Sequence, residues 1–421
     1  MRYTLSRQLK SSVAVFLLFL LAGSIFAQQQ YFPARDKWER REPQQVGIDP
    51  IRLQRAVEFA RANESKSPRN LALAHFQTFG REPYDEPLGP FKERGAVSGL
   101  IIKAGYIVAE WGDPQRVDMA FSVTKSFLSA TAAVALDRKL IRSFSDRVAD
   151  YWTPTLAYDP GTRFDVAVRL GRSPFIEPFE SENNQTITWD NLLRQTSDWE
   201  GTLWGKPDWA DRPDRDPTNW LTRKRNLPGT VYEYNDVRVN LLALCLLNVW
   251  RRPLPMVLKE FVMDEIGASN TWRWFGYETS FVVIDGQIVQ SVSGGGHWGG
   301  GMFINSFDMA RFGLLTLRNG RWANKQILPT EFIKQAKSPT IPQPTYGFMN
   351  WFLNTERKLY PSAPSAAFAH IGNGTNLIYV DPESDVVAVV RWIENSKIDE
   401  FLGLLTLAVS EQKKSQVGDR D

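Results

Sequence analysis

The stretch that decides the fold is Phe121-Ser-Val-Thr-Lys-Ser126, which opens a long run of apolar and small residues. The run reaches about Leu140 and has the length and composition of a buried helix. Residues three apart share a helix face, about 5–6 Å apart at Cβ, so Ser122 and Lys125 are predicted neighbours. Ser122 falls at the predicted N-terminus, where unpaired N–H groups and the helix dipole favour negative charge.

A serine and a lysine placed in this way suit nucleophilic catalysis. Burial beside the positive end of a helix is expected to lower the pKa of Lys125, so that its amine accepts the serine proton. The spacing also arises by chance: Ser410-Glu-Gln-Lys413 matches it, but that copy runs into a polar tail with no buried helix after it. Taken alone, Ser122 has a second interpretation as an ordinary helix N-cap.

A second segment, Leu227-Pro-Gly-Thr-Val-Tyr-Glu-Tyr-Asn-Asp236, precedes another helix-patterned run. Tyr234 stands at the mouth of that predicted helix, where a phenol can relay a proton between a nucleophile and a leaving group. The structural alternative is a half-buried aromatic side chain that bonds to backbone. Asp236 can pair with Lys125 and keep it protonated, which would leave Tyr234 as the working base.

A third segment, Phe368-Ala-His-Ile-Gly-Asn-Gly-Thr375, runs into a predicted strand. A glycine-rich strand edge lets a substrate backbone approach closely, and an N–H group there can share an oxyanion hole with that of Ser122. His370, Gly372 and Asn373 are therefore candidate site residues, although His370 has a plain structural alternative. The chain's three histidines are scattered without zinc-ligand spacing, so no metal or cofactor is expected.

The two ends of the chain carry predicted β-hairpins. Val97–Lys103 and Ile107–Trp111 flank a short turn, and residues 376–380 and 386–393 flank a turn rich in Asp and Pro. A helix-patterned segment follows from Ile398 to about Lys413. We expect an α/β (α+β) fold with an antiparallel sheet built from both chain ends and flanked by helices.

The middle of the chain is predicted to be helical. Runs with helical spacing cover Phe121 to about Leu140, 189–194, 237–249 and 254–266, between long loops. We expect one domain over residues 46–415, with an all-helical insertion lobe at about 121–280 and a cleft where the lobes meet.

The three segments, in this order, resemble the serine β-lactamase and penicillin-binding-protein superfamily, within the branch of class C β-lactamases, esterases and 6-aminohexanoate-dimer hydrolases. Flanking stretches that look like this branch's landmarks are Ile187–Ser197, Trp298–Gly313 and Tyr346–Trp351. The resemblance implies a β-lactamase/transpeptidase-like fold, an acyl-enzyme on Ser122, Lys125 as its partner and Tyr234 as base and acid. It also implies that the N–H groups of Ser122 and Asn373 form the oxyanion hole.

The sequence departs from the family pattern at two positions. The second motif has Asp236 in place of the family's asparagine, and the third carries His370 where β-lactamases carry lysine. An added acidic group and a lost lysine attract the carboxylate of lactam antibiotics less, so poor β-lactamase activity is expected.

Several aromatic residues are candidates for a substrate rim. Trp199, Trp204, Trp209 and Trp220 punctuate a polar loop, and His297 and Trp298 interrupt a glycine run. Tryptophans that pin the loop to the body are the alternative, and close backbone packing accounts for the glycines.

The N-terminus has the pattern of a secretory signal. Three basic residues precede an apolar run from Val13 to Ala22, and cleavage is predicted near Ala27. The alternative is a membrane anchor, but the run is shorter than the roughly 20 residues that a spanning helix needs. We expect residues 1–27 to be a signal, 28–45 a lead-in and 416–421 a polar tail, in an exported (periplasmic or secreted) protein. Cys245 lies within an apolar helical run and is expected in the core.

The composition restricts the partners. The 50 basic and 47 acidic residues give a net charge of +3 without long single-sign runs, which is unlike a nucleic-acid-binding protein. We expect a small-molecule or peptide-like amide or ester as substrate, and no membrane span after signal cleavage. Two alternatives stay open: a DD-peptidase acting on cell-wall peptides, and a non-catalytic binding module on the same fold.

Overall fold

The computed structural model describes residues 30–35, 37–158 and 174–410. The predicted signal at 1–27 and the polar tail at 416–421 lie outside the described residues. Among the described helices, no single one is long and apolar enough to cross a membrane. One pair meets that test together, Asp236–Trp250 with Leu254–Met263, but the two are bent by 75° at the break between them.

A six-stranded antiparallel sheet joins the two ends of the chain, as the sequence predicted. Its strand order is β12-β13-β14-β15-β1-β2. The strands are β1 (Ser98–Lys103), β2 (Tyr106–Trp111), β12 (Trp351–Phe352), β13 (Phe368–Gly372), β14 (Asn376–Asp381) and β15 (Val386–Arg391). The two predicted hairpins are confirmed, and they meet where β15 pairs with β1.

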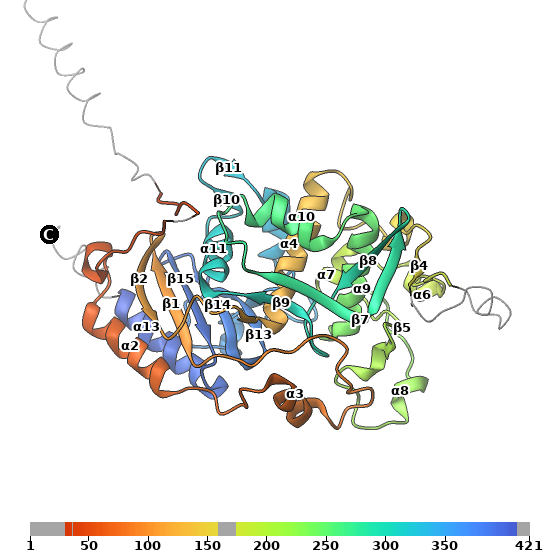
Figure 1. Ribbon diagram of the computed structural model, residues 1–421, viewed down its shortest axis with the longest axis horizontal. Helices are drawn as coiled ribbons and strands as arrows, with labels where there is room; N and C mark the ends of the chain where they lie inside the picture. The colour runs from red at the N-terminus through yellow and green to blue at the C-terminus, as the bar shows by residue number, and fades with distance from the viewer. Residues whose placement is uncertain (1–29, 36, 159–173, 411–421) are drawn as a thin grey trace, which may run out of the picture.

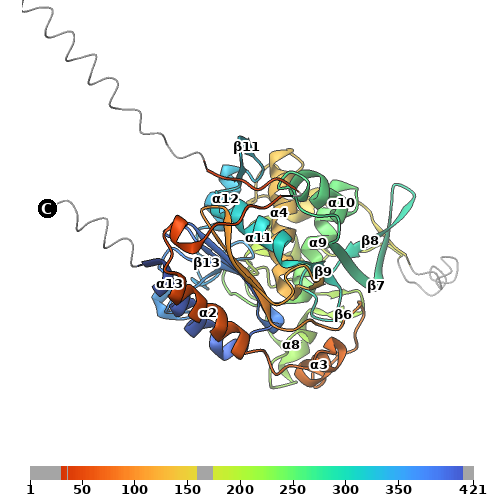
Figure 2. The same ribbon diagram turned by 60° about the vertical axis from the view of Figure 1, so that its left-hand side comes forward.

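Both faces of this sheet are buried, which explains the nearly continuous apolar composition of its central strands. Alternate residues of β15 point to opposite sides: Val386, Ala388 and Val390 pack with α2 (Pro50–Ala62) and α13 (Ile398–Ser410). These two helices lie side by side along the outer face in Figure 1, and Figure 2 brings them forward. The N- and C-terminal segments therefore form one layer together.

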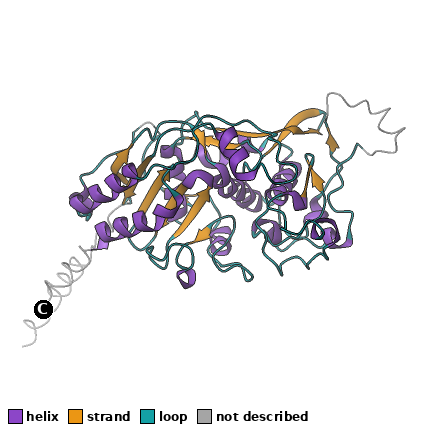
Figure 3. Cartoon of the chain, turned by 90° about the horizontal axis from the view of Figure 1, so that it is seen from below, coloured by secondary structure: helices purple, strands orange, loops and turns teal. Residues whose placement is uncertain are grey.

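The inner face of the sheet packs on the helical middle of the chain. Val387 and Val389 point to this side and belong to the core that contains α4 (Thr124–Asp137), α9 (Asp236–Trp250) and α11 (Ser306–Leu317). A Cβ on Gly313 of α11 would lie 2.7 Å from side-chain atoms of Ile378 and Val387, so this helix sits close on the strands because residue 313 is glycine. Figure 3 shows helices on both sides of the strands.

The middle of the chain is not all-helical, which corrects the prediction for the insertion lobe. A second antiparallel sheet has the order β3-β9-β7-β4, with β8 paired to β7. Its strands are β3 (Asp118–Met119), β4 (Leu156–Ala157), β7 (Arg273–Ile284), β8 (Gln287–Val292) and β9 (Gly301–Ile304). Aromatic and β-branched residues give β7 its strand propensity, while a register shift between Gly276 and Phe281 breaks the simple alternation.

The remaining elements are short. The helices are α3 (Leu71–Phe79), α6 (Glu182–Gln185), α7 (Trp189–Leu193), α8 (Asn219–Thr222), α10 (Leu254–Leu258) and α12 (Thr330–Ala336). Two small hairpins pair β5 (Thr202–Leu203) with β6 (Lys206–Pro207) and β10 (Arg321–Trp322) with β11 (Lys325–Gln326). Cys245 is buried in α9, as expected of a core residue.

A buried arginine ties the two sheets together. From the end of β15, Arg391 donates hydrogen bonds to Asn376 Oδ1 (2.7 Å), to the carbonyl of Ile304 in β9 (2.6 Å) and to that of Met119 in β3 (2.9 Å). Burial lowers its pKa to about 10, so the group is still charged at neutral pH. Because β3 leads directly into the turn that carries Ser122, this arginine helps to fix where that turn lies.

Replacing Arg391 by methionine is expected to destabilise the fold by about 3–5 kcal/mol, because it removes a buried donor from each of two carbonyl groups and one amide oxygen. Urea unfolding followed by circular dichroism measures this loss. Arg61→Met on the exposed end of α2 is the matched control and is expected within about 0.5 kcal/mol of wild type. Equal stability of the two variants would contradict the role given to Arg391.

Candidate active site

Ser122 sits on a tight turn between β3 and α4. The turn is a 3-10 segment, Phe121–Val123, and Phe121 has a φ of 48°, a left-handed conformation that a non-glycine residue rarely adopts. The Ala120 N–H bonds to Met302 O at 2.8 Å, which fixes the entry to the turn. α4 begins two residues later at Thr124, so Ser122 lies just ahead of the helix rather than within it.

Ser122, Lys125 and Asp236 form a connected chain of polar atoms. Lys125 Nζ donates to Ser122 Oγ at 2.8 Å and to Asp236 Oδ1 at 2.5 Å. The side chains of Lys125 and Asp236 are only 2% and 1% exposed, and they belong to α4 and α9, 111 residues apart. The structure thus brings together the serine, the lysine and the aspartate that the sequence singled out.

Asp236 changes the expected charge state of Lys125. Burial by itself would lower the pKa of this amine, but the adjacent carboxylate outweighs burial and raises it. The pKa of Asp236 is lowered, because the charges of Lys125 and Arg212 outweigh its own desolvation. The predicted low pKa of Lys125 is therefore corrected: at neutral pH Lys125 is an ammonium group that donates to Ser122.

The glycine run beside the ion pair leaves it room. A Cβ on Gly295 would lie 2.1 Å from Lys125 Nζ and 2.3 Å from Asp236 Oδ2. Two residues further along the chain, the backbone N–H of His297 donates to Asp236 Oδ2 at 3.0 Å. Close backbone packing, one interpretation of these glycines, is what the structure has here.

Tyr234 faces two cations. Its ring centroid is 4.6 Å from Lys125 Nζ and 5.1 Å from the guanidinium carbon of Arg212. The ring also packs against Trp351 at a centroid distance of 5.8 Å. Asn235 caps α9 by accepting the N–H of Arg238, which fixes the backbone immediately after Tyr234.

These groups border a cavity of about 480 Å³, which Ser122, Tyr234, Arg212, Gly372 and Asn373 line together. β13 ends against the serine turn: a Cβ on Gly372 would lie 2.2 Å from Ala120 O and 3.0 Å from Ser122 N. Only glycine permits this approach, which places the backbone at the end of β13 beside the N–H of Ser122. α3 closes another wall with Leu71, Ala74, His75, Thr78 and Phe79.

His370 does not line this cavity. Alternation along β13 turns its side chain into the core, where Nδ1 lies 2.8 Å from Ser126 Oγ. The Ser126 hydroxyl donates to Met349 O, so we assign Nδ1 as the nitrogen that carries the hydrogen. Burial lowers the pKa of His370 to about 3, and the imidazole is neutral. The third segment thus supplies backbone and glycine to the cavity, but no cation.

The candidate rim residues lie elsewhere. Trp199, Trp204, His297 and Trp298 are all buried, and none of them lines the cavity at Ser122. Trp199 instead donates its indole N–H to Pro178 O at 2.7 Å, which pins its loop to the body. Trp209 and Trp220 stack on each other, with centroids 5.1 Å apart, beside a second cavity.

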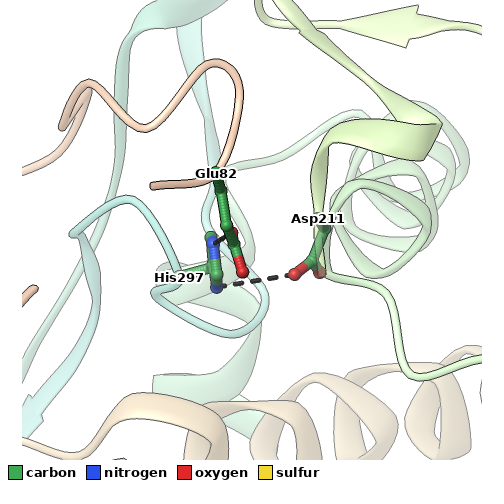
Figure 4. A group of neighbouring side chains, drawn as sticks. All are labelled: Glu82, Asp211 and His297. Atoms are coloured by element: carbon green, nitrogen blue, oxygen red, sulfur yellow. Dashed lines mark hydrogen bonds and ion pairs between the residues drawn. The ribbon is translucent and has the colours of Figure 1, made fainter. Parts of the chain in front are cut away.

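Glu82, Asp211 and His297 form a cluster whose donor types would suit a metal ion, with Asp211 and His297 buried and Glu82 partly exposed (Figure 4). His297 uses a different nitrogen toward each carboxylate: Nε2 lies 2.9 Å from Glu82 Oε2 and Nδ1 lies 3.5 Å from Asp211 Oδ1. Asp211 Oδ1 is also paired with Arg212, and Oδ2 accepts the N–H of Asp236. Only the Nε2 contact is a hydrogen bond, and Nδ1 has no hydrogen-bond partner among the described residues. The two carboxylates lie at different ring nitrogens, and one ion cannot use both.

No sequence motif singles out Arg212, Glu82 or α3 as parts of the site. Arg212 lies in a polar loop without hydrophobic periodicity. Its backbone φ is 52°, a left-handed conformation that sequence patterns predict for glycine but not for arginine. Glu82 reaches the site from a segment about 130 residues before Asp211, so only the tertiary fold reveals the contact. The apolar spacing in Leu71–Phe79 was the one local signal that was available.

The fold and this geometry define a class of protein. A mixed α/β body with a helical lobe, and a serine and lysine at the start of a buried helix beneath a strand edge, is the β-lactamase/transpeptidase fold. The Beta-lactamase family model matches residues 94–397, and the chain belongs to this family. A search of the curated proteins finds no match to this chain.

Solved structures share the fold at low sequence identity. A protein from Bacillus anthracis assigned as a 6-aminohexanoate-dimer hydrolase has 16% identity and a TM-score of 0.50, over 78% of this chain and 81% of that one. A protein from Bacteroides dorei assigned as a β-lactamase has 15% identity and a TM-score of 0.50, over 80% and 97%. EstCE1, a hydrolase with promiscuous acyltransferase activity, has 14% identity and a TM-score of 0.50, over 85% of this chain and 98% of that one.

Removing the carboxylate of Asp236 is expected to lower turnover at least tenfold. Asp236→Ala leaves the Lys125 ammonium buried without its partner and free to leave Ser122 Oγ, and it costs about 3–5 kcal/mol of stability. Steady-state kinetics on a chromogenic ester, with circular dichroism as a check of folding, measure both effects.

Asp285→Ala is the control for this change, because Asp285 forms an exposed ion pair with Arg251. A folded Asp236→Ala protein with unchanged kinetics would rule out the role given to the ion pair.

His370 is expected to make the protein less stable as the pH falls. The folded pKa of about 3 lies below the unfolded value of 6.5, so below pH 6.5 only the unfolded chain binds the proton. His370 therefore lowers the free energy of unfolding by about 1.4 kcal/mol for each pH unit of acidification between pH 6.5 and 3. In His370→Asn this loss is absent, so the stability gap to wild type narrows on acidification.

Urea unfolding at pH 7.5, 6 and 5 measures this gap. A gap that stays constant over that range would show that His370 is not held neutral in the fold.

Proposed function

We propose that this protein is a serine hydrolase that cleaves an amide or ester through an acyl-enzyme on Ser122. The observation that carries the proposal is the 2.8 Å contact between Ser122 Oγ and Lys125 Nζ at the border of a cavity that Tyr234 also lines. A plain N-cap role for Ser122 would need neither a buried ammonium group nor a cavity at its hydroxyl.

In acylation, Ser122 Oγ attacks the substrate carbonyl carbon while Tyr234 takes the hydroxyl proton. Lys125, held as an ammonium group by Asp236, donates to Oγ and stabilises the negative charge that develops there. The N–H groups of Ser122 and Asn373 are the proposed donors to the carbonyl oxygen, since β13 ends beside the serine turn. Tyr234 then gives the proton to the leaving amine or alcohol.

Deacylation repeats the same steps with water. A water molecule that enters the cavity attacks the acyl carbon, Tyr234 removes its proton, and Ser122 Oγ leaves with a proton returned from Tyr234. No step requires a metal ion or organic cofactor, because the chain's own groups handle every proton.

The proposed substrate is a small or peptide-like amide or ester rather than a lactam. The family lysine of the third segment is replaced by His370, which is buried and uncharged, so the strand edge has no cation at that position. Neighbours of the same fold include a protein assigned as a 6-aminohexanoate-dimer hydrolase and the hydrolase EstCE1 as well as one assigned as a β-lactamase, so the argument against a lactam rests on His370 and not on the fold.

The test is intact-mass analysis of the protein and of Ser122→Ala after exposure to a fluorophosphonate, with a panel of chromogenic esters, short amides and nitrocefin. We expect one adduct on the wild type, none on Ser122→Ala, and turnover of esters or amides well above that of nitrocefin. Ser126→Ala, one helical turn along α4, is the matched control for loss of a buried hydroxyl.

Two results would replace the proposal. Stable labelling by a fluorescent penicillin together with release of D-alanine from cell-wall peptides would identify a DD-peptidase instead. A folded protein with neither an adduct nor turnover would be a binding module on the same fold.

A further inference from the structure

Arg212 is a charged group inside the cavity that neither the family motifs nor the proton-transfer steps use. Its side chain is 38% exposed, whereas the side chain of its ion-pair partner Asp211 is fully buried. The guanidinium carbon is 5.1 Å from the ring centroid of Tyr234 and 5.8 Å from that of Phe79, so two aromatic rings hold it. Asp211 anchors one end through Nη1.

The hydrogen-bonding capacity of Arg212 is mostly unused. A guanidinium group has five N–H donors in a planar fork, and among the described residues the one hydrogen bond found for Arg212 is to Asp211. The remaining donors belong to a side chain that lines the 480 Å³ cavity with Ser122 and Tyr234. A planar fork of this kind matches the two oxygens of a carboxylate.

Arg212 also borders the second cavity, of about 310 Å³, which Trp209, Trp220 and Arg223 line with it. The same side chain therefore borders both spaces. A substrate that extends from Ser122 toward the stacked tryptophans would lie near this cation. Arg223, the other arginine of the second cavity, is already paired with Asp198 and Glu233.

The charges around the site are balanced in a way that leaves Arg212 attractive to an anion. Asp236 is paired with Lys125, and Asp211 contacts Arg212 at its anchored end. An anion bound to the free donors would lie nearer to the guanidinium group than to the Asp211 carboxylate, so the attraction to Arg212 would exceed the repulsion from Asp211. Glu82, a third acidic side chain nearby, contacts His297 Nε2 at 2.9 Å and forms no ion pair with Arg212 among the described residues.

We propose that Arg212 binds a carboxylate of the substrate, so that this hydrolase selects amides or esters that carry an anionic group near the scissile bond. The inference rests on the proposed function, because it deepens the description of the same site. The cation that the third segment lacks is thus supplied from a different element and at a different place in the cavity.

The first experiment compares matched esters that differ by one charge. Mono-4-nitrophenyl adipate carries the carboxylate on the acyl chain, and methyl 4-nitrophenyl adipate is its neutral counterpart; 4-carboxyphenyl acetate and its methyl ester place the charge on the leaving group. We expect wild type to favour the anionic member of at least one pair, and Arg212→Gln to lower that kcat/KM ratio at least tenfold, mainly through KM. Arg212→Lys keeps the charge without the fork and is expected to restore part of the ratio.

Arg215→Gln is the matched control, because Arg215 is an exposed arginine of the same loop that lines neither cavity. It is expected to leave the ratio at its wild-type value. An unchanged ratio in Arg212→Gln, or an equal fall for both members of each pair, would overturn the proposal, since the latter is what a purely structural role predicts.

A binding experiment separates this proposal from the hydrolase itself. Calorimetry with Ser122→Ala and mono-4-nitrophenyl adipate measures affinity without turnover, and adding Arg212→Gln is expected to weaken it at least tenfold. If fluorophosphonate labels Ser122 but the two affinities are equal, only the role of Arg212 fails. If no adduct forms while binding still depends on Arg212, the hydrolase proposal fails and the carboxylate site stands.

Discussion

The buried ion pair between Lys125 and Asp236 is the interaction on which the site depends. Two charges that are almost fully removed from water are tolerated only when they are close and when their remaining hydrogen-bonding positions are filled. Here Lys125 also donates to Ser122 Oγ, and Asp236 also accepts the N–H of His297. Losing one partner would strand the other charge, so α4, α9 and the glycine run must all be in place together.

The same pair fixes the positions of Ser122 and Tyr234, the proposed reacting groups, because both residues lie close to it along the chain. Ser122 precedes Lys125 by three residues, and Tyr234 precedes Asp236 by two. Once the pair forms, the nucleophile and the phenol are carried to one border of the cavity. Arg391 fixes the two sheets relative to each other, because it links β15 to β3, the strand that leads into the serine turn.

The walls of the cavity come from segments that have no motif of their own, and polar ties hold them. Arg238 of α9 bonds to Asp198 at 2.8 Å and so keeps the loop that carries Arg212 against the helix. Lys206 donates to the carbonyl groups of Tyr84 and Glu86, which joins that loop to the segment after α3. The lining of the cavity is therefore set largely by parts of the chain outside the three motif segments.

Local pattern predicted the parts of the structure that local chemistry decides. The terminal hairpins follow from β-rich runs around turns, and the buried helices follow from long apolar runs, so both could be placed from the sequence. β7 was missed because a register shift breaks its alternation and a helical middle was the simpler interpretation. Burial of Trp199, Trp204, His297 and Trp298 was missed because exposure in a loop depends on what packs over it, which no local pattern records.

Charge is the property for which the sequence was least informative, because a charge acts through its neighbours. Compared with the family motifs, Asp236 adds a negative charge to the sequence and His370 replaces a positively charged lysine. In the fold, Asp236 is neutralised by Lys125, His370 is turned into the core, and Arg212 enters the cavity from a loop 24 residues before the second motif's aspartate. The strand edge thus lacks the family's lysine, and the cavity instead has a cation, Arg212, on the wall beside Tyr234 and Phe79. Under the proposed roles of Ser122, Tyr234 and Arg212, the site presents its positive charge to a different part of the substrate, and a change of this kind alters selectivity while leaving the proposed chemistry at Ser122 intact.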